Sequence, residues 1–258
     1  PVAGGSNSTA SLCNVVAQAC EQIRDRVARA AAAQGAPFAG SDPATLTLSD
    51  GALRAPSGQS EPLEQAVGRI TRGAVEAYAE NSPHGAPPDA IGGLYEGHSA
   101  PSGGAKLKDR IQFAFGAQFV EVRVNLRTRE IRAPRAVGAF AAGKLVNPKT
   151  ARSQLMGGQI WGISAALHEA TEIDRRAARY VNTDLAEYYI PVNADVVDVT
   201  TILVPEEDTS VNPLQIKGLG ELGNVGLNAA VANAVYHATG VRVRDLPIRL
   251  EKLLKASV

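Results

Sequence analysis

The chain has 258 residues, of which 45% are apolar and 20% charged, the composition of an ordinary globular protein with one large or two small domains. Lys and Arg together number 26, as do Asp and Glu, so no excess of positive charge favours nucleic acid or an acidic membrane as a partner. No run approaches the roughly 18 apolar residues of a membrane-spanning helix. Because the first residue is Pro1, we expect a fragment or a processed piece of a longer protein.

The first predicted element is a long helix at residues 9–34, where apolar residues recur at helical spacing. Ser8 or Thr9 can cap its start. Cys13 and Cys20 lie on one face of this helix, separated by a rise of about 10.5 Å, which exceeds the roughly 7 Å limit for a disulfide. We expect both cysteines to be buried as small apolar residues.

The middle of the chain predicts shorter elements. We expect a strand within residues 44–54 and a helix at 62–78. Residues 81–106 are rich in Pro and Gly and predict a long irregular loop. A strand at 110–124 changes its alternation phase part-way, which indicates a bulge or a strand covered on both faces, and its hairpin partner follows at 129–140.

The remaining elements complete a mixed pattern. A helix at 147–169 contains small residues that imply close backbone packing. Strands are expected near 179–182 and 196–204, then a loop at 205–224, a helix at 225–239 and a short helix at 246–255. We therefore expect an α+β fold in which mixed sheet hairpins pack with helices.

Residues 218–223 match the dinucleotide fingerprint G-x-G-x-x-G, with Asp245 about 20 residues further on. The fingerprint needs a buried strand immediately before it, whereas the preceding run EEDTSVNP is polar and turn-forming. We disfavour an NAD-binding module, and this alternative predicts a strand directly before Gly218.

Two further patterns concern metal binding and acid–base chemistry. His168-Glu169 resembles half of a zinc-protease helix but lacks the second histidine, so we predict no metal ligands. Glu221 lies between glycines, in a loop that leads into a helix. Glycines allow close approach of a ligand and a helix start favours an anion, so this carboxylate can serve as a general base. From the residues alone, a helix-capping role for Glu221 is favoured.

The run QIKGLGE at residues 215–221 resembles the K-G-x-G-E signature of the xanthine dehydrogenase/aldehyde oxidase family, in its molybdopterin-binding large subunit. Other segments agree with this family in the same order: GSNST at 5–9, FGAQFVEV at 115–122, Asn147-Pro148 followed by Gln154, Gly157 and Gly158, VANAV at 231–235, and RDLPI at 244–248. Residues 1–258 thus resemble the C-terminal part of the molybdopterin-binding domain, in a pattern similar to bacterial periplasmic aldehyde oxidase large subunits.

The resemblance implies a role for each matching residue. Glu221 corresponds to the family's catalytic base, and Gln154 to a glutamine that hydrogen-bonds the pterin. The remaining cofactor-binding residues are those of the pterin and phosphate loop, Gly5, Ser6, Ser8 and Thr9, and those that shape the loop presenting Glu221, namely Lys217, Gly218 and Gly220. The metal is held by the pterin's sulfurs, so side-chain metal ligands are not expected.

The implied reaction is oxidative hydroxylation of an aldehyde or an N-heterocycle, with water as the oxygen source. The implied cofactor is molybdopterin, plain or as the cytosine dinucleotide, and iron–sulfur and FAD subunits are the implied partners. Leu222 replaces the proline of xanthine dehydrogenases, which disfavours a purine substrate, and Arg129 replaces a common hairpin glycine. The alternative is a non-catalytic fragment or split subunit, since the family's N-terminal region supplies much of the cofactor cleft.

Overall fold

The computed structural model describes residues 4–82, 87–98 and 112–254. The chain divides into two compact units, one formed by Ala10–Lys106 and the other by Val2–Thr9 with Leu107–Val258. In the described parts of the chain, no helix combines the length and apolarity needed to cross a membrane.

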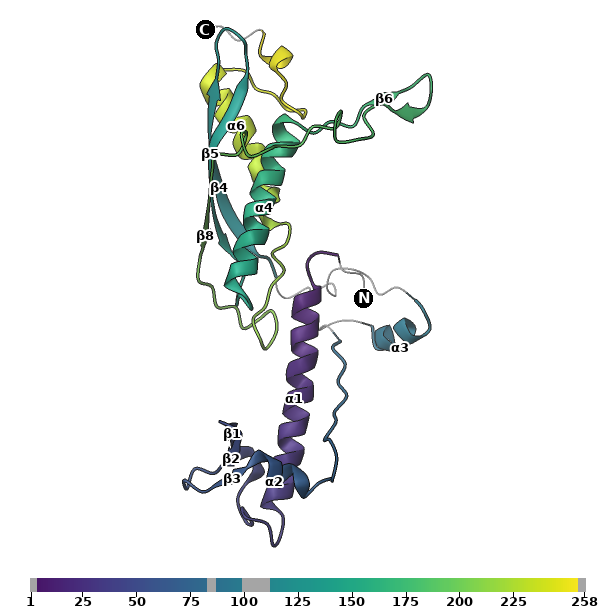
Figure 1. The fold of residues 1–258 in the computed structure, drawn as a ribbon, viewed down its shortest axis with the longest axis vertical. Coiled ribbons are helices and arrows are strands. Elements are labelled where there is room, and N and C mark those ends of the chain that lie inside the picture. The colour runs from purple at the N-terminus through teal and green to yellow at the C-terminus, as the bar shows by residue number, and fades with distance from the viewer. Residues whose placement is uncertain (1–3, 83–86, 99–111, 255–258) are drawn as a thin grey trace. The chain divides into compact units, whose positions relative to one another are not determined.

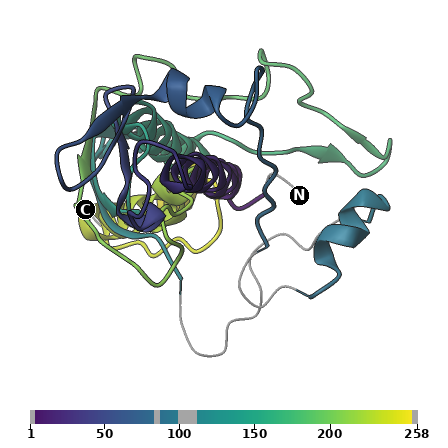
Figure 2. The ribbon, with the colours of Figure 1, turned by 90° about the horizontal axis from the view of Figure 1, so that it is seen from below.

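The first unit is built on the long helix α1, Ser8–Ala32. Its other elements are η1 (Pro43–Thr45), β1 (Thr47–Ser49), β2 (Ala52–Arg54), β3 (Ser60–Pro62), α2 (Leu63–Gly68) and α3 (Ala90–Tyr95). The three strands form an antiparallel sheet. The sheet and α2 gather at the C-terminal end of α1, which Figure 2 shows nearly end-on. The core between them consists of Val27, Ala28, Ala31, Phe38, Leu46, Leu53 and Ala66.

Three predictions for this unit need correction. The helix expected at 62–78 ends at Gly68, because Gly68 and Gly73 weaken helix formation and the following segment is extended, with Arg26 donating to the carbonyl of Glu76 at 2.7 Å. α3 lies inside the expected loop at 81–106, of which residues 83–86 and 99–106 fall outside the described parts. Both cysteines are free as expected, but neither is buried, since Cys13 is partly exposed and Cys20 is exposed.

The second unit contains a three-stranded sheet in the order β4 (Phe115–Val124), β5 (Ile131–Ala141) and β8 (Asp198–Leu203). β4 and β5 form the expected antiparallel hairpin, and its register shifts between Glu121 and Arg123, as the bulge among the two expected alternatives requires. β5 and β8 pair in parallel, which requires the long crossover that α4 (Pro148–Leu167) provides. Arg129 adopts a left-handed φ of 61° at the hairpin turn, the conformation that glycine would adopt without strain.

Helices cover one face of this sheet. α4 and α6 (Leu227–Thr239) lie on the same side of it (Figure 1). The core beneath them joins Ala133, Ala136, Ile163, Ala166, Leu227, Val231, Val235, Val243, Ile248 and Leu253. The helix expected at 246–255 is a short 3-10 helix, η2 (Leu250–Leu253). A small hairpin of β6 (Ile173–Asp174) and β7 (Arg179–Tyr180) extends from the unit. The expected α+β class is confirmed.

Candidate functional site

The glycine loop at residues 218–223 packs directly on the segment before α1. A Cβ atom on Gly218 would lie 2.6 Å from the carbonyl oxygen of Gly5, and one on Gly220 would collide with the Ser6 hydroxyl. The N–H of Gly220 donates to Ser6 Oγ at 3.0 Å. Gly5 and Ser6 have φ angles of 64° and 59°, so both adopt the left-handed conformation. The structure therefore brings together four of the predicted cofactor-binding residues.

α4 adds Gln154 to this group. The helix begins at a strong local signal, since the side chain of Asn147 accepts hydrogen bonds from the backbone N–H groups of the first turn. One turn later, Gln154 Nε2 lies 3.7 Å from the position that a Cβ on Gly220 would occupy. The Gln154 side chain is exposed and makes no hydrogen bond with any described residue. Its amide is available to a ligand.

A second close contact between backbones sets the start of the next helix. α5 (Leu222–Val225) lies against α4 at Gly158 and Gly223. A Cβ on Gly158 would lie 2.9 Å from Gly223 Cα, and one on Gly223 would collide with the carbonyl oxygen of Leu155. Of the small residues predicted in α4, Gly158 is therefore required by this close packing, which fixes α5 against α4.

Glu221 is the N-cap residue of α5, but its side chain makes no capping hydrogen bond. The favoured helix-capping interpretation is therefore wrong. The residue is exposed, and within the described parts of the chain its carboxylate has no hydrogen-bond or salt-bridge partner. The carboxylate is thus free for another role, one residue from Gly220.

Ser8 and Thr9 occupy the first positions of α1 and are exposed. They lie two and three residues after Ser6, which contacts the glycine loop. Backbone N–H groups at a helix start favour anions, so the predicted phosphate loop has suitable chemistry.

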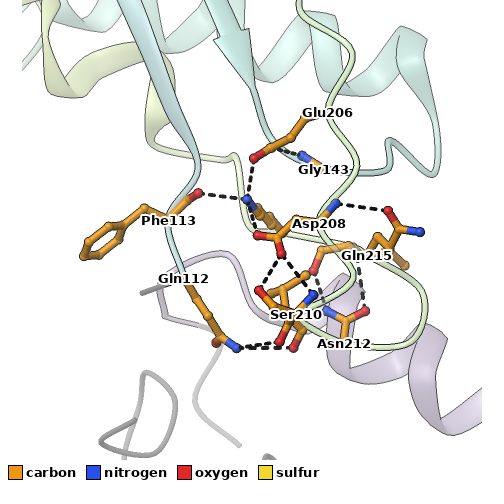
Figure 3. A network of polar contacts seen from close by, with 11 residues as sticks. Gln112, Phe113, Gly143, Glu206, Asp208, Ser210, Asn212 and Gln215 are labelled. Carbon is orange, nitrogen blue, oxygen red and sulfur yellow. Dashed lines mark hydrogen bonds and ion pairs between the residues drawn. The ribbon is translucent and has the colours of Figure 1, made fainter. Parts of the chain in front are cut away.

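Lys217 differs from the other predicted cofactor residues. Its side chain is only 6% exposed. The ammonium group donates to Glu206 Oε1 at 2.6 Å, Asp208 Oδ2 at 2.8 Å and the carbonyl oxygen of Phe113 at 3.0 Å (Figure 3). These three partners satisfy all three of its donors. Burial alone would lower the pKa of Lys217, but the hydrogen bonds to Asp208 and Glu206 outweigh it and raise that pKa.

Gln118 on β4 is a residue that sequence reasoning missed. Its Nε2 donates to the carbonyl oxygens of Leu222 at 3.1 Å and Gly223 at 3.0 Å. These carbonyls immediately follow Glu221, so Gln118 holds the loop on the far side of the candidate base. The only signal in the sequence was its place inside the family-like segment at 115–122.

The alternative sites receive no support. Ile216 forms only an isolated antiparallel bridge with Gly143, so the strand that an NAD module predicts before Gly218 is absent from the described structure. No group of three or more His, Cys, Asp or Glu residues suited to a metal ion occurs in the described ranges. A groove of about 480 Å³ between β4 and α6 contains none of the predicted site residues.

The comparison with protein families decides between these interpretations. A family model described as "Molybdopterin cofactor-binding domain" matches residues 1–197, more than half of the chain. The chain belongs to the molybdopterin cofactor-binding domain family. The match confirms the resemblance drawn from the motifs, although its range ends before the glycine loop and Glu221.

Curated relatives of this molybdopterin cofactor-binding domain are subunits of oxidoreductases. The aldehyde oxidoreductase molybdenum-binding subunit PaoC of Escherichia coli (strain K12) is 41% identical over 194 residues, covering 75% of this chain and 26% of the relative. The xanthine dehydrogenase molybdenum-binding subunit of Escherichia coli O157:H7 is 31% identical over 140 residues, covering 54% of this chain and 18% of the relative. The chain thus spans about a quarter or less of these relatives.

Solved structures share the fold. The Cu,Mo-CO dehydrogenase matches with a TM-score of 0.72 at 17% identity, covering 97% of this chain and 29% of that chain. Quinoline 2-oxidoreductase from Pseudomonas putida 86 matches with a TM-score of 0.66 at 22% identity, covering 93% of this chain and 29% of that chain. At these identities the likeness concerns the fold alone.

Proposed function

We propose that this chain forms part of the molybdopterin site of a molybdenum hydroxylase, in which Glu221 is the general base. The observation that supports this proposal most is the arrangement around Gly220. The Ser6 hydroxyl oxygen accepts a hydrogen bond from the N–H of Gly220, and the Gln154 amide lies beside Gly220. The free carboxylate of Glu221 belongs to the next residue in the chain.

The described residues fit a pterin cofactor. The exposed amide of Gln154 offers both a donor and an acceptor. The exposed start of α1, at Ser8 and Thr9, offers N–H groups and hydroxyls for a phosphate. Gly5 and Ser6 complete this loop, the first through its carbonyl beside Gly218 and the second through its hydroxyl beside Gly220. We propose these residues as the cofactor-binding set.

The overall reaction is R–CHO plus water to R–COOH, with release of two electrons and two protons, or the equivalent step on an N-heterocycle. When bound, the molybdenum cofactor supplies the two-electron oxidant and activates water. An oxygen of the Glu221 carboxylate accepts the proton that this water loses, which raises the nucleophilicity of its oxygen. Electrons leave through iron–sulfur and FAD partner subunits, and the cofactor is molybdopterin in its plain or cytosine dinucleotide form.

The test is the substitution Glu221→Gln in the holoenzyme. It keeps size and removes basicity, so we expect kcat to fall by about 10²–10⁴-fold with molybdenum content unchanged. Glu207→Gln is the matched control, because Glu207 is an exposed glutamate earlier in the same stretch of chain and should keep full turnover. An E221Q enzyme that retained most of its turnover would refute the assignment.

The alternative is that this chain by itself is non-catalytic and needs the rest of a large subunit. It is supported by the coverage of about a quarter of the aldehyde oxidoreductase relative. Molybdenum and pterin analysis of the purified chain separates the two. Stoichiometric cofactor in the chain alone would contradict the need for other regions, and its absence would support it.

A further inference from the structure

Lys217, Glu206 and Asp208 form a partly buried ion cluster at the entrance to the glycine loop. Their side chains are 6%, 16% and 21% exposed. Two carboxylates around one ammonium group need additional hydrogen bonds to compensate for the loss of solvation. Both carboxylates have such partners, and each partner ties a different part of the chain to the cluster.

Glu206 connects the cluster to the end of the sheet. Its Oε2 accepts from the N–H of Gly143 at 2.7 Å, just beyond β5 (Figure 3). The adjacent Lys144 N–H donates to the carbonyl oxygen of Gln215 at 2.8 Å, and Gly143 pairs with Ile216. The segment before Lys217 is therefore joined to the sheet by side-chain and backbone bonds together.

Asp208 closes the loop on itself. Its Oδ1 accepts from the N–H of Ser210 at 3.0 Å and from the Ser210 hydroxyl, and its own N–H donates to Gln215 Oε1 at 3.1 Å. The Asn212 side chain accepts from Ile216 N–H at 3.2 Å and donates to Ile216 O at 2.7 Å. Figure 3 shows these bonds converging on the turn. These hydrogen bonds thus fix the backbone from Asp208 to Ile216, the residue before Lys217.

We propose that Glu206 and Asp208 are positioning residues for Glu221, and that they act by fixing Lys217 rather than by contacting cofactor or substrate. The proposal rests on the proposed function of Glu221. Lys217 directly precedes Gly218, whose backbone abuts Gly5, so the cluster sets where the glycine loop begins. Ser6 and Gln118 then hold the loop on either side of Glu221. Lys217 is a structural anchor, since Phe113, Glu206 and Asp208 satisfy its three donors.

The test is Lys217→Met in the holoenzyme, with four readouts. We expect kcat to fall by about 10- to 100-fold, because a small displacement of a catalytic group is costly, while KM changes by less than about twofold. Molybdenum content should stay unchanged. Amide hydrogen exchange of residues 218–223 should accelerate by about tenfold. Asp208→Asn removes one of the two ion pairs and should shift the same readouts in the same direction by less.

Lys252→Met is the matched control, because Lys252 also bonds three protein oxygens, here one carboxylate and one carbonyl of Asp245 and the carbonyl of Pro247. It should leave kcat and exchange at 218–223 unchanged. If K217M lost molybdenum without faster exchange, Lys217 would be a cofactor ligand and the proposal would be overturned. Unchanged kcat and exchange in K217M would overturn it too. If K217M does not fold, D208N decides by the same readouts.

The exchange readout also separates this proposal from the function of Glu221. If E221Q were active, the assignment of Glu221 as general base would be refuted. The exchange of residues 218–223 would still test whether the cluster anchors the loop. Faster exchange in K217M and D208N would then support anchoring of the loop, and normal exchange would overturn it.

Discussion

Asp208 lies between the buried ammonium group of Lys217 and the backbone and hydroxyl of Ser210. The hydrogen bond from Lys217, followed by those from Ser210, lowers the pKa of Asp208 from 3.8 to about 2. A folded-state pKa below the unfolded value means that the ionised carboxylate stabilises the folded loop. This contribution is complete above about pH 4 and is lost as the pH falls through about 2.

The first prediction follows from this shift. The melting temperature of the wild-type chain should exceed that of Asp208→Asn at pH 7, because only the wild type keeps both charged partners of Lys217. The difference should shrink as the pH falls from about 4 to about 2. Thermal melts of both proteins across this range provide the measurement, and other acidic groups cancel in the comparison. A difference that stayed constant to pH 2 would contradict the role of Asp208.

Several residues of the candidate site could be identified from the sequence, but their contacts could not. Ser6 and Gly220 both belong to family-like motifs, yet the hydrogen bond that joins them spans 214 positions. In the sequence, Glu206 and Asp208 are part of a polar, turn-forming run, and no neighbouring residue indicates that they surround a lysine. Pairings between distant segments depend on tertiary packing, which leaves no periodic trace in the sequence.

At the scale of elements, the contact between α4 and α5 depends on which glycine faces it. Gly158 lies against the backbone of Gly223, whereas a Cβ placed on Gly157 would have no heavy atom of another described element within 4 Å. Of these two adjacent glycines, only Gly158 must be small for α4 and α5 to pack at this distance.

The second prediction compares these two positions. Gly158→Ala should destabilise the protein by about 1–3 kcal/mol through overpacking. Gly157→Ala should stabilise it by about 0.5–1 kcal/mol, since alanine is the better helix former and meets no neighbour. Urea unfolding midpoints measure both effects. Changes of the same sign in the two variants would contradict the role of Gly158 as the contact residue.

Elements with strong local signals were predicted well, and those decided by distant contacts were not. Asn147 and the small residues after it predict α4. The alternation of apolar and polar residues predicts the β4–β5 hairpin, and the change in its phase is consistent with the bulge. The helix predicted at 62–78 is longer than α2, because Arg26 holds Glu76 in an extended segment. The parallel pairing of β5 with β8 joins strands separated by a whole helix, so no local pattern reveals it.

At the scale of the whole molecule, each of the two units has its own core. In the first unit, Glu61 on β3 is 4% exposed and pairs with both terminal nitrogens of Arg69, one of them at 2.9 Å. The Arg69 side chain is 31% exposed, so water reaches part of this pair. The pair joins β3 to the residue after α2.

The third prediction concerns the independence of that core. Glu61→Gln should destabilise the first unit by about 2 kcal/mol, less than for a fully buried pair because Arg69 remains partly solvated. Amide exchange should accelerate at residues 46–67 and stay unchanged at 115–141. Glu64→Gln, which alters an exposed carboxylate on α2, is the control. Equal acceleration in both ranges would show that the two cores unfold together.

The hydrogen bond between Ser6 and Gly220 also has a consequence for the order of folding. Its partners are 214 positions apart, and closing so long a loop is entropically unfavourable until intervening segments have folded. During synthesis, Gly220 leaves the ribosome long after Ser6. The carboxylate of Glu221 is therefore expected to reach its place among the last events of folding, so any cofactor that uses it must be inserted into a chain that is already complete.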